Sequence, residues 1–207
     1  SAMIRKVAVV VFPGFQVLDA TGPMAAFEIA SRFAGEGQGY RLDVVAARAG
    51  LVESSSGAAL AARGLGDGPY DTVLVSGGIG ARALEALPPL AAWLTRQADA
   101  ARRMASVCTG ALLLAEAGLL DGRRATTHWA ASSLFSRRYP QVRLEPDRIF
   151  VRDGRFWTSA GITAGIDLAL ALVEEDLGAA IARRTAQQLV VHHRRAGGQS
   201  QFSALLE

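Results

Sequence analysis

The sequence predicts an α/β domain built on a mainly parallel central sheet. Segments with strand character alternate with segments with helix character, and Gly and Pro residues separate them. The opening run, residues 4–12, is nearly continuous in β-branched residues, which is typical of a strand buried on both faces. Half of the 207 residues are hydrophobic, so the chain can bury one substantial core, and one domain is expected rather than two.

The first helix is expected soon after this strand. Pro13-Gly14 ends the strand, and the helix is predicted to run from Asp19 or Thr21 to Phe33. Pro23 then lies near the first turn, where its missing N–H does no harm.

Further elements follow in strand and helix order. A second strand is expected over residues 41–47, and the short polar segment 53–57 indicates a small hairpin off the main sheet. The apolar run 72–75 predicts the third central strand. A helix begins at Pro88 or Pro89 and continues towards residue 101.

In the second half of the chain, two dipeptides indicate turns. These are Asp121-Gly122 and Asp153-Gly154, and apolar runs on both sides of the second predict a hairpin over residues 149–157. Two helices, 162–174 and 179–193, complete the predicted elements.

Cys108 is the only cysteine, and its surroundings are distinctive. It lies between the apolar run 104–107 and the helix-like run 111–117, with the small residues Ser106 and Gly110 two positions to either side. This is the layout of a nucleophile elbow, a sharp strand-to-helix turn that strains and exposes one side chain. Because a helix N-terminus stabilises an anion, we expect the thiol to ionise more readily than a free cysteine. A buried structural cysteine fits the pattern equally well.

Other candidate site residues come from two loops at the carboxyl ends of predicted strands. Asp19 follows the first strand and can enter the same crevice as Cys108, where a raised carboxyl pKa would let it share or shuttle a proton. It can also be a helix N-cap, and the two roles are not exclusive. The amides of Gly77 and Gly78 can form an oxyanion or carboxylate hole beside the thiol, although a tight turn with positive φ also explains these glycines. Their sequence matches neither nucleotide-binding pattern, so no nucleotide is expected.

The three histidines do not predict a metal site. None of His128, His192 and His193 has metal-ligand spacing with Cys108, so neither a metal nor another cofactor is expected. His128 begins an expected helix and can line the crevice as a ligand contact, or it can be a half-buried structural residue. Thr109, rather than a histidine, follows Cys108, so a peptidase base would have to come from elsewhere in the chain.

Charge and cysteine content exclude other classes. The formal net charge is only +3, and the Arg residues are dispersed, so the chain has no stripe for nucleic acid. A lone cysteine allows no internal disulfide and suits a cytoplasmic protein. Residues 4–12 are too short and too charged for a signal peptide or a membrane span, and no membrane association is expected. Residues 1–2, Ser and Ala before Met3, are interpreted as a cloning scar.

Several motifs occur together in one chain: Leu18-Asp19-x-x-Gly22-Pro23, the turn Ser76-Gly77-Gly78, Val107-Cys108-Thr109-Gly110-Ala111, and Thr126-Thr127-His128-Trp129. In this combination the sequence resembles the PfpI superfamily, with the class I glutamine amidotransferase-like fold. The resemblance covers nearly the whole chain. It implies a flavodoxin-like sandwich with the cysteine on the elbow, and a homodimer.

Two branches of that superfamily share the combination. One is the isonitrile hydratases, for which the resemblance implies that Cys108 attacks an isonitrile carbon while Asp19 and Thr109 assist. The other is the amino-terminal domains of AraC-type transcriptional regulators, in which the same pocket binds a small-molecule effector. The peptidase and chaperone branches usually carry Cys-His at the elbow and Glu at the position of Asp19, so this sequence departs from both.

The last part of the chain favours the regulator branch. Residues 187–203 resemble the segment that leads from the sensing domain to a helix-turn-helix DNA-binding domain, and Gly197-Gly198 indicates a helix stop before a polar linker. We therefore expect a PfpI-like sensing domain over residues 3–195 and the start of a linker over 196–207, with DNA bound only through a domain absent from this chain. A third interpretation is a redox sensor whose Cys108 thiolate oxidises to sulfenic acid.

Overall fold

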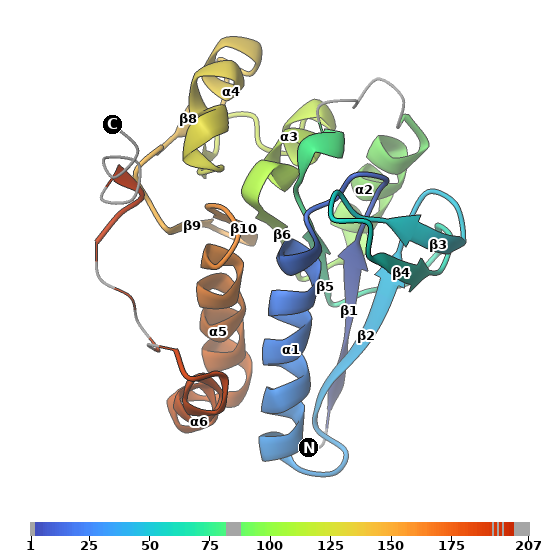
Figure 1. The fold of residues 1–207 in the computed structure, drawn as a ribbon, viewed down its shortest axis with the longest axis vertical. Coiled ribbons are helices and arrows are strands. Elements are labelled where there is room, and N and C mark those ends of the chain that lie inside the picture. The colour runs from blue at the N-terminus through green and yellow to red at the C-terminus, as the bar shows by residue number, and fades with distance from the viewer. Residues whose placement is uncertain (1–2, 82–87, 192, 194, 196, 201–207) are drawn as a thin grey trace.

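A computed structural model describes residues 3–81, 88–191, 193, 195 and 197–200. Its main sheet has six strands in the order β2-β1-β5-β6-β10-β9 (Figure 1). The first five strands in this order run parallel, and β9 is antiparallel to β10. The predicted α/β fold with a mainly parallel sheet is therefore confirmed. The strand bounds are β1 Ile4–Val10, β2 Gly39–Val45, β5 Thr72–Val75, β6 Arg103–Val107, β9 Phe150–Asp153 and β10 Phe156–Ser159.

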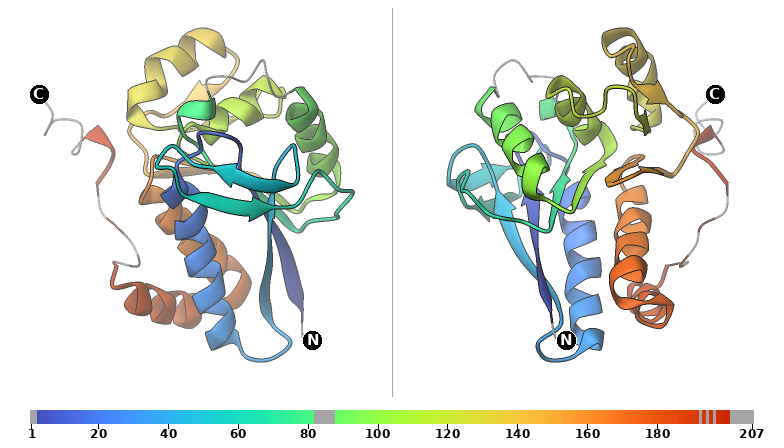
Figure 2. Two further views of the ribbon diagram at one scale, coloured as in Figure 1. Left: turned by 45° about the vertical axis from the view of Figure 1, so that its right-hand side comes forward. Right: turned by 180° about the vertical axis from the view of Figure 1, so that it is seen from behind.

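Helices cover both faces of this sheet (Figures 1 and 2). On one face α1, α5 and α6 pack against one another, and α2 and α3 contact each other on the opposite face. Smaller elements lie outside this sandwich, among them the predicted hairpin of β3 and β4. The remaining bounds are α1 Val17–Ala34, β3 Gly50–Glu53, β4 Ala59–Ala62, α2 Pro88–Ala100, α3 Ala111–Glu116, β7 Arg124–Ala125, α4 Ser132–Arg138, β8 Arg143–Leu144, α5 Ala164–Leu177 and α6 Ala179–Leu189.

The start of α1 differs from the prediction. The helix begins at Val17, two residues before the earliest predicted start, so Pro23 lies in its second turn and not in its first. Proline has no N–H, so the carbonyl of Asp19, four residues earlier, lacks its usual helical donor. Asp19 lies in the first turn, and the residue before the helix is Gln16.

The bounds of the two C-terminal helices also differ from the prediction: α5 begins and ends later than expected, and α6 ends earlier. Ile162 has a φ of +46°, and α5 begins only at Ala164. Helix α6 ends at Leu189 because Val190 takes a left-handed conformation with φ +58°. The amides of Val190 and Val191 bond back to the carbonyls of residues 187 and 186, which is a Schellman motif. The predicted end of this helix at residue 193 is therefore wrong.

A buried ion cluster fixes the end of the sheet where the parallel strands begin. Asp176 near the end of α5 has a fully buried carboxylate, and both of its oxygens accept hydrogen bonds from the guanidinium of Arg103 at the start of β6. Arg102 and Tyr40 donate to the same carboxylate at 2.7 Å each. The opposite end of the sheet, where the strands finish, is thus free to carry variable loops.

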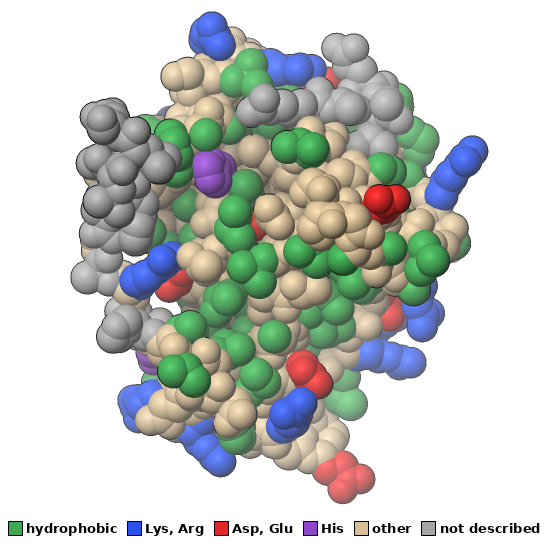
Figure 3. All heavy atoms as spheres, viewed as in Figure 1, with side chains coloured by type: hydrophobic (Ala, Val, Ile, Leu, Met, Phe, Trp, Pro, Cys, Tyr) green, Lys and Arg blue, Asp and Glu red, His purple; other side chains and the backbone are tan. Residues whose placement is uncertain are grey.

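The surface agrees with the charge analysis. On the face drawn in Figure 3, the Lys and Arg side chains are scattered around the rim and do not form one patch. Within the part of the chain that the structure describes, no helix is long and apolar enough to span a membrane.

Candidate functional site

Cys108 lies on a strained turn directly after β6. Its φ is +57°, in the left-handed region that costs a non-glycine residue about 1–2 kcal/mol. Neighbouring loops hold the turn on two sides: the Cys108 amide donates to the Ala160 carbonyl at 3.2 Å, and Thr127 Oγ1 donates to the Cys108 carbonyl at 2.9 Å. The strained turn expected from the sequence is present, and contacts from distant segments fix its geometry, but the Cys108 side chain is buried and not exposed as the elbow pattern predicts.

Close packing of the loop after β5 explains the glycines around the elbow. A Cβ on Gly77 would lie 2.6 Å from the Thr109 nitrogen and 2.8 Å from the Cβ of Cys108. A Cβ on Gly110 would lie 2.4 Å from the carbonyl oxygen of Val75. Real Cβ atoms do not approach backbone this closely, so both positions require glycine. Gly78 in addition has a φ of +137°, which supports the tight-turn interpretation.

Asp19 lies fully buried beside the elbow. Its Oδ2 accepts a hydrogen bond from the Gly77 amide at 3.1 Å, and its Oδ1 is buried with no hydrogen-bond partner among the described residues. Burial raises the pKa of Asp19 to about 7, and the Gly77 amide and the Cys108 thiol oppose this rise. The pKa of Asp19 is raised, as predicted, but the cause is burial and not a neighbouring thiolate. Its predicted role as a helix N-cap is wrong, because the cap position is Gln16.

The expected ionisation of Cys108 is wrong. The side chain is 6% exposed, and its burial, followed by the negative charge of Asp19, raises the thiol pKa to about 12. The Thr109 amide and hydroxyl act in the opposite direction but do not compensate. The dipole of the short helix that follows is too weak to outweigh the loss of water. At neutral pH, Cys108 is therefore a protonated thiol beside the carboxyl group of Asp19.

The two amides expected to bind an anion already have acceptors within the protein. Gly77 donates to Asp19, and Gly78 donates to Thr109 Oγ1 at 2.9 Å. Thr109 Oγ1 in turn donates to the Gly78 carbonyl at 3.1 Å. A developing oxyanion would have to displace one of these contacts, so the loop holds Asp19 and Thr109 in place more readily than it binds a ligand.

His128 is a neutral hydrogen-bond donor at the edge of the same site. Its Nδ1 accepts a hydrogen bond from the Ala130 amide at 3.1 Å, which leaves the proton of the neutral ring on Nε2. Burial lowers its pKa, so the ring stays neutral at physiological pH. Gly161 permits the ring to lie here, because a Cβ at that position would overlap His128 Cδ2.

These residues surround one cavity of about 210 Å³. Four of the predicted site residues line it, namely Gly78, Cys108, Thr109 and His128, while Asp19 and Gly77 lie behind this wall. Sequence reasoning missed its other walls. Ser55 lies at the cavity because its amide donates a hydrogen bond to the Phe15 carbonyl, which holds the β3–β4 hairpin over the site. No local sequence pattern predicts that contact. Other lining residues outside the prediction are Gln16, Ile79, Ala130, Ala131 and Ile162.

The described residues contain no group of three or more His, Cys, Asp or Glu side chains that could hold a metal ion. His192 lies outside the described residues. His193, the third histidine of the sequence analysis, pairs with Glu174 at 3.5 Å and lies at a different site.

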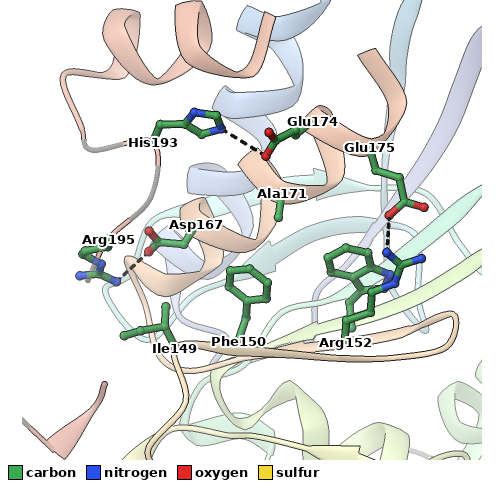
Figure 4. Close-up of a pocket in the computed structure, with 10 residues that line it drawn as sticks. Ile149, Phe150, Arg152, Asp167, Ala171, Glu174, Glu175, His193 and Arg195 are labelled. Carbon is green, nitrogen blue, oxygen red and sulfur yellow. Dashed lines mark hydrogen bonds and ion pairs between the residues drawn. The ribbon is translucent and has the colours of Figure 1, made fainter. Parts of the chain in front are cut away.

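That second site is a larger cavity of about 630 Å³ (Figure 4). Its apolar wall includes Phe150 from β9 and Ala171 from α5. Two ion pairs border it, Arg195–Asp167 and Arg152–Glu175, and His193 Nε2 lies 3.5 Å from a carboxylate oxygen of Glu174. None of the catalytic or ligand-binding residues predicted from the sequence lies here.

A comparison with family models identifies one match, described as the DJ-1/PfpI family, over residues 5–175. A solved structure titled as a THiJ/PfpI family protein from Pseudomonas syringae superposes with a TM-score of 0.79 at 29% identity, over 90% of this chain and 75% of the other.

Two curated relatives have different functions in their names. The HTH-type transcriptional regulator CdhR of Pseudomonas aeruginosa is 36% identical over 86% of this chain and 53% of its own length. The isonitrile hydratase of Pseudomonas putida is 45% identical over 58% of this chain and 51% of its own length. The chain thus matches about half the length of each of these two relatives.

Proposed function

Because the chain belongs to the DJ-1/PfpI family, we propose that it is the sensing domain of an AraC-type transcriptional regulator. In this proposal a small-molecule effector binds in the cavity at Cys108 and controls DNA binding by a helix-turn-helix domain outside these 207 residues. The similarity to the regulator CdhR supports this, since it extends over 86% of this chain but only 53% of CdhR.

The observation that carries the proposal is that the backbone amides of Gly77 and Gly78 already donate hydrogen bonds within the protein. An acyl-transfer or addition enzyme presents free N–H groups to the charge that develops in the transition state. Here the Gly77 and Gly78 amides bind Asp19 and Thr109 instead. A sensing pocket needs only to bind its ligand with different affinity in two conformations of the protein, and it does not have to stabilise the charge of a transition state.

The cavity chemistry indicates the kind of effector. Its volume of about 210 Å³ lies below the range of drug-sized sites, so the ligand portion it holds is small. The thiol of Cys108 and the Nε2–H of neutral His128 can both donate hydrogen bonds. We infer a small polar molecule with an acceptor group directed at these two residues.

The second candidate is an isonitrile hydratase-like enzyme, which the Asp19–Cys108 pair favours. As the sulfur attacks the isonitrile carbon, the thiol proton would pass to Asp19 Oδ1 and then to the substrate, giving a thioimidate. Water would add to the same carbon, and departure of the thiol would release the N-formamide. The pKa of Asp19, near 7, suits a proton carrier at neutral pH. The redox-sensor interpretation is disfavoured, because a buried thiol with a pKa near 12 forms little thiolate.

DNA binding tests the proposed domain division. The DNA upstream of the gene is titrated at physiological salt with this chain and with the same chain extended by its downstream coding sequence. We expect sequence-specific binding only by the extended protein. The Lys and Arg side chains of this chain are dispersed, so they form no surface that could follow the DNA phosphates or contact the base edges. Tight, sequence-dependent binding by the 207 residues alone would contradict the proposal.

We also propose that the protein is a cytoplasmic homodimer, since paired DNA half-sites are read by symmetric dimers. Sedimentation at micromolar concentration should then show a species of twice the chain mass. A monomer at that concentration would remove this part of the proposal.

A further inference from the structure

The described residues after α6 bind back onto the domain, although the sequence predicts a linker from residue 196. We call residues 193, 195 and 197–200 the strap. Its Gln199 is only 3% exposed. Gln199 Nε2 lies within 3.1 Å of three acceptors: Thr126 Oγ1 and the carbonyl oxygens of Thr127 and Arg148. A freely mobile linker would not bury an amide among three acceptors.

Backbone contacts reinforce this docking. The Gln199 amide donates to the Asp147 carbonyl at 2.7 Å, and the Ser200 amide donates to Asp147 Oδ1 at 2.7 Å. A Cβ on Gly198 would lie 2.5 Å from the same Asp147 carbonyl, so only glycine permits this approach. The strap is therefore fitted to the loop before β9.

One ion pair and one histidine–carboxylate contact hold the first part of the strap over α5. Arg195 bonds to Asp167 at 2.7 Å, and His193 lies 3.5 Å from Glu174 (Figure 4). In Figure 1 the strap, in red, runs along the side of the domain that carries α5 and β9.

One residue connects the strap to the elbow. Thr127 accepts a hydrogen bond from Gln199 through its carbonyl and donates one to the Cys108 carbonyl through its hydroxyl, at 3.0 and 2.9 Å. Movement of Gln199 therefore changes a direct support of the Cys108 backbone.

A third cavity is lined by residues of both the strap and the Cys108 site. It has a volume of about 320 Å³, shares His128 and Ile162 with the Cys108 cavity, and is also lined by Gln199 and Arg195. Gln199 Oε1 is buried without a hydrogen-bond partner among the residues described, although its Nε2 is fully used. A buried unpaired acceptor is costly, and a donor from a ligand would satisfy it.

We propose that the ligand site extends from the Cys108 cavity past His128 into this third cavity, where Gln199 Oε1 accepts a hydrogen bond from the far end of the ligand. The ligand class is a small polar molecule with an amide, hydroxyl or ammonium donor at that end. Because Gln199 belongs to the strap, a bound ligand fixes the segment through which the chain leaves the domain. This inference rests on the proposed sensing function and adds its ligand contact and its route of regulation.

A series of thiol reagents tests the contact without knowledge of the effector. Alkyl methanethiosulfonates with two, four or six methylene groups, ending either in ammonium or in methyl, are attached to Cys108 and verified by intact mass. Hydrogen exchange of the peptide covering residues 197–200 is then measured. For at least one of the longer chain lengths, we expect the backbone amides of residues 197–200 to exchange about three- to tenfold more slowly with the ammonium reagent than with the methyl reagent. This difference corresponds to one added hydrogen bond.

Gln199→Met replaces the side chain by one of similar length that has no amide oxygen. It should abolish the difference in exchange rate between the ammonium and methyl reagents. Gln187→Met, at an exposed position on α6, should keep it. Equal exchange with both end groups at every length, or a difference that persists in Gln199→Met, would overturn the proposal.

A second measurement applies even if the reagents reach Cys108 incompletely. Gln199→Met should increase the rate of Cys108 alkylation by iodoacetamide several-fold relative to Gln187→Met, because the Thr127 support of the elbow loosens. An unchanged rate would contradict the coupling. Neither measurement involves DNA or isonitrile turnover, so failure here is distinguishable from failure of the proposed function.

Discussion

The amide of Gly77 lies 3.1 Å from Oδ2 of Asp19 and donates a hydrogen bond to it. This contact joins the loop after β5 to the first turn of α1, while Oδ1 of the same carboxyl is buried without a hydrogen-bond partner among the described residues. One oxygen of Asp19 thus holds the loop, and the negative charge of the carboxyl group is close enough to Cys108 to raise the pKa of the thiol.

The charge of Asp19 should slow thiol ionisation. Asp19→Asn removes the negative charge that, after burial, is the main cause of the raised Cys108 pKa. We expect iodoacetamide to react with Cys108 roughly three- to tenfold faster at pH 8 in this variant, since each unit of pKa changes the thiolate fraction about tenfold. The measurement is the pseudo-first-order rate across pH 7–10, with Cys108→Ser as the unlabelled control. A slower variant would show that Asp19 activates the thiol.

Stability should depend on pH through Asp19. Its pKa is about 7 in the folded protein and lower in the unfolded chain, so the folded state binds more protons between these values. The contribution of Asp19 to stability is therefore full below pH 4 and lost as the pH rises to about 7. In urea unfolding, the free energy of unfolding of Asp19→Asn should rise relative to that of the wild type as the pH increases across this window. A difference independent of pH would contradict the raised pKa.

Gly77→Ala should distort the elbow. Its Cβ would collide with the Thr109 nitrogen, the Cys108 Cβ and the Val107 carbonyl, so we expect a loss of about 1–3 kcal/mol in the free energy of unfolding. Gly66→Ala is the matched control, because its Cβ meets nothing within 4 Å. Equal unfolding midpoints for the two variants would refute the close approach.

The buried ion cluster should be a point of high sensitivity. Asp176→Asn leaves Arg103, itself 2% exposed, without its buried counter-charge and should cost about 3–5 kcal/mol. Burial alone raises the Asp176 pKa, but Arg103, Tyr40 and Arg102 outweigh it and hold that pKa below its usual value. The stabilisation is therefore lost as the pH falls below the ordinary range of aspartate. Glu175→Gln, which breaks the more exposed pair with Arg152, should cost less than about 1 kcal/mol.

The elements with strong local signals were predictable from the sequence. The apolar run of β5 and the Asp-Gly turn between β9 and β10 gave strands close to those observed. Helix ends were less predictable, because the left-handed residue that ends α6 is Val190, and a β-branched residue carries no signal for that conformation.

Within the candidate site, residue types were predictable and electrostatics were not. The motifs identified Asp19 and Cys108, but the pKa of a thiol depends on how much water the fold excludes, which periodicity does not reveal. The use of the Gly77 and Gly78 amides also depends on loops that meet only in three dimensions. The docking of Gln199 could not be predicted from its composition, because its three acceptors belong to segments that are distant in the sequence.

Turnover of an isonitrile separates a sensor from an enzyme most directly. The chain is incubated with a simple alkyl or aryl isonitrile, and the N-formamide is followed by NMR, with Cys108→Ser as the control. Because the loop amides already bind Asp19 and Thr109, we expect no more than trace conversion, equal in both proteins. Sustained multiple turnover that disappears in Cys108→Ser would contradict the sensing function and establish the hydratase function.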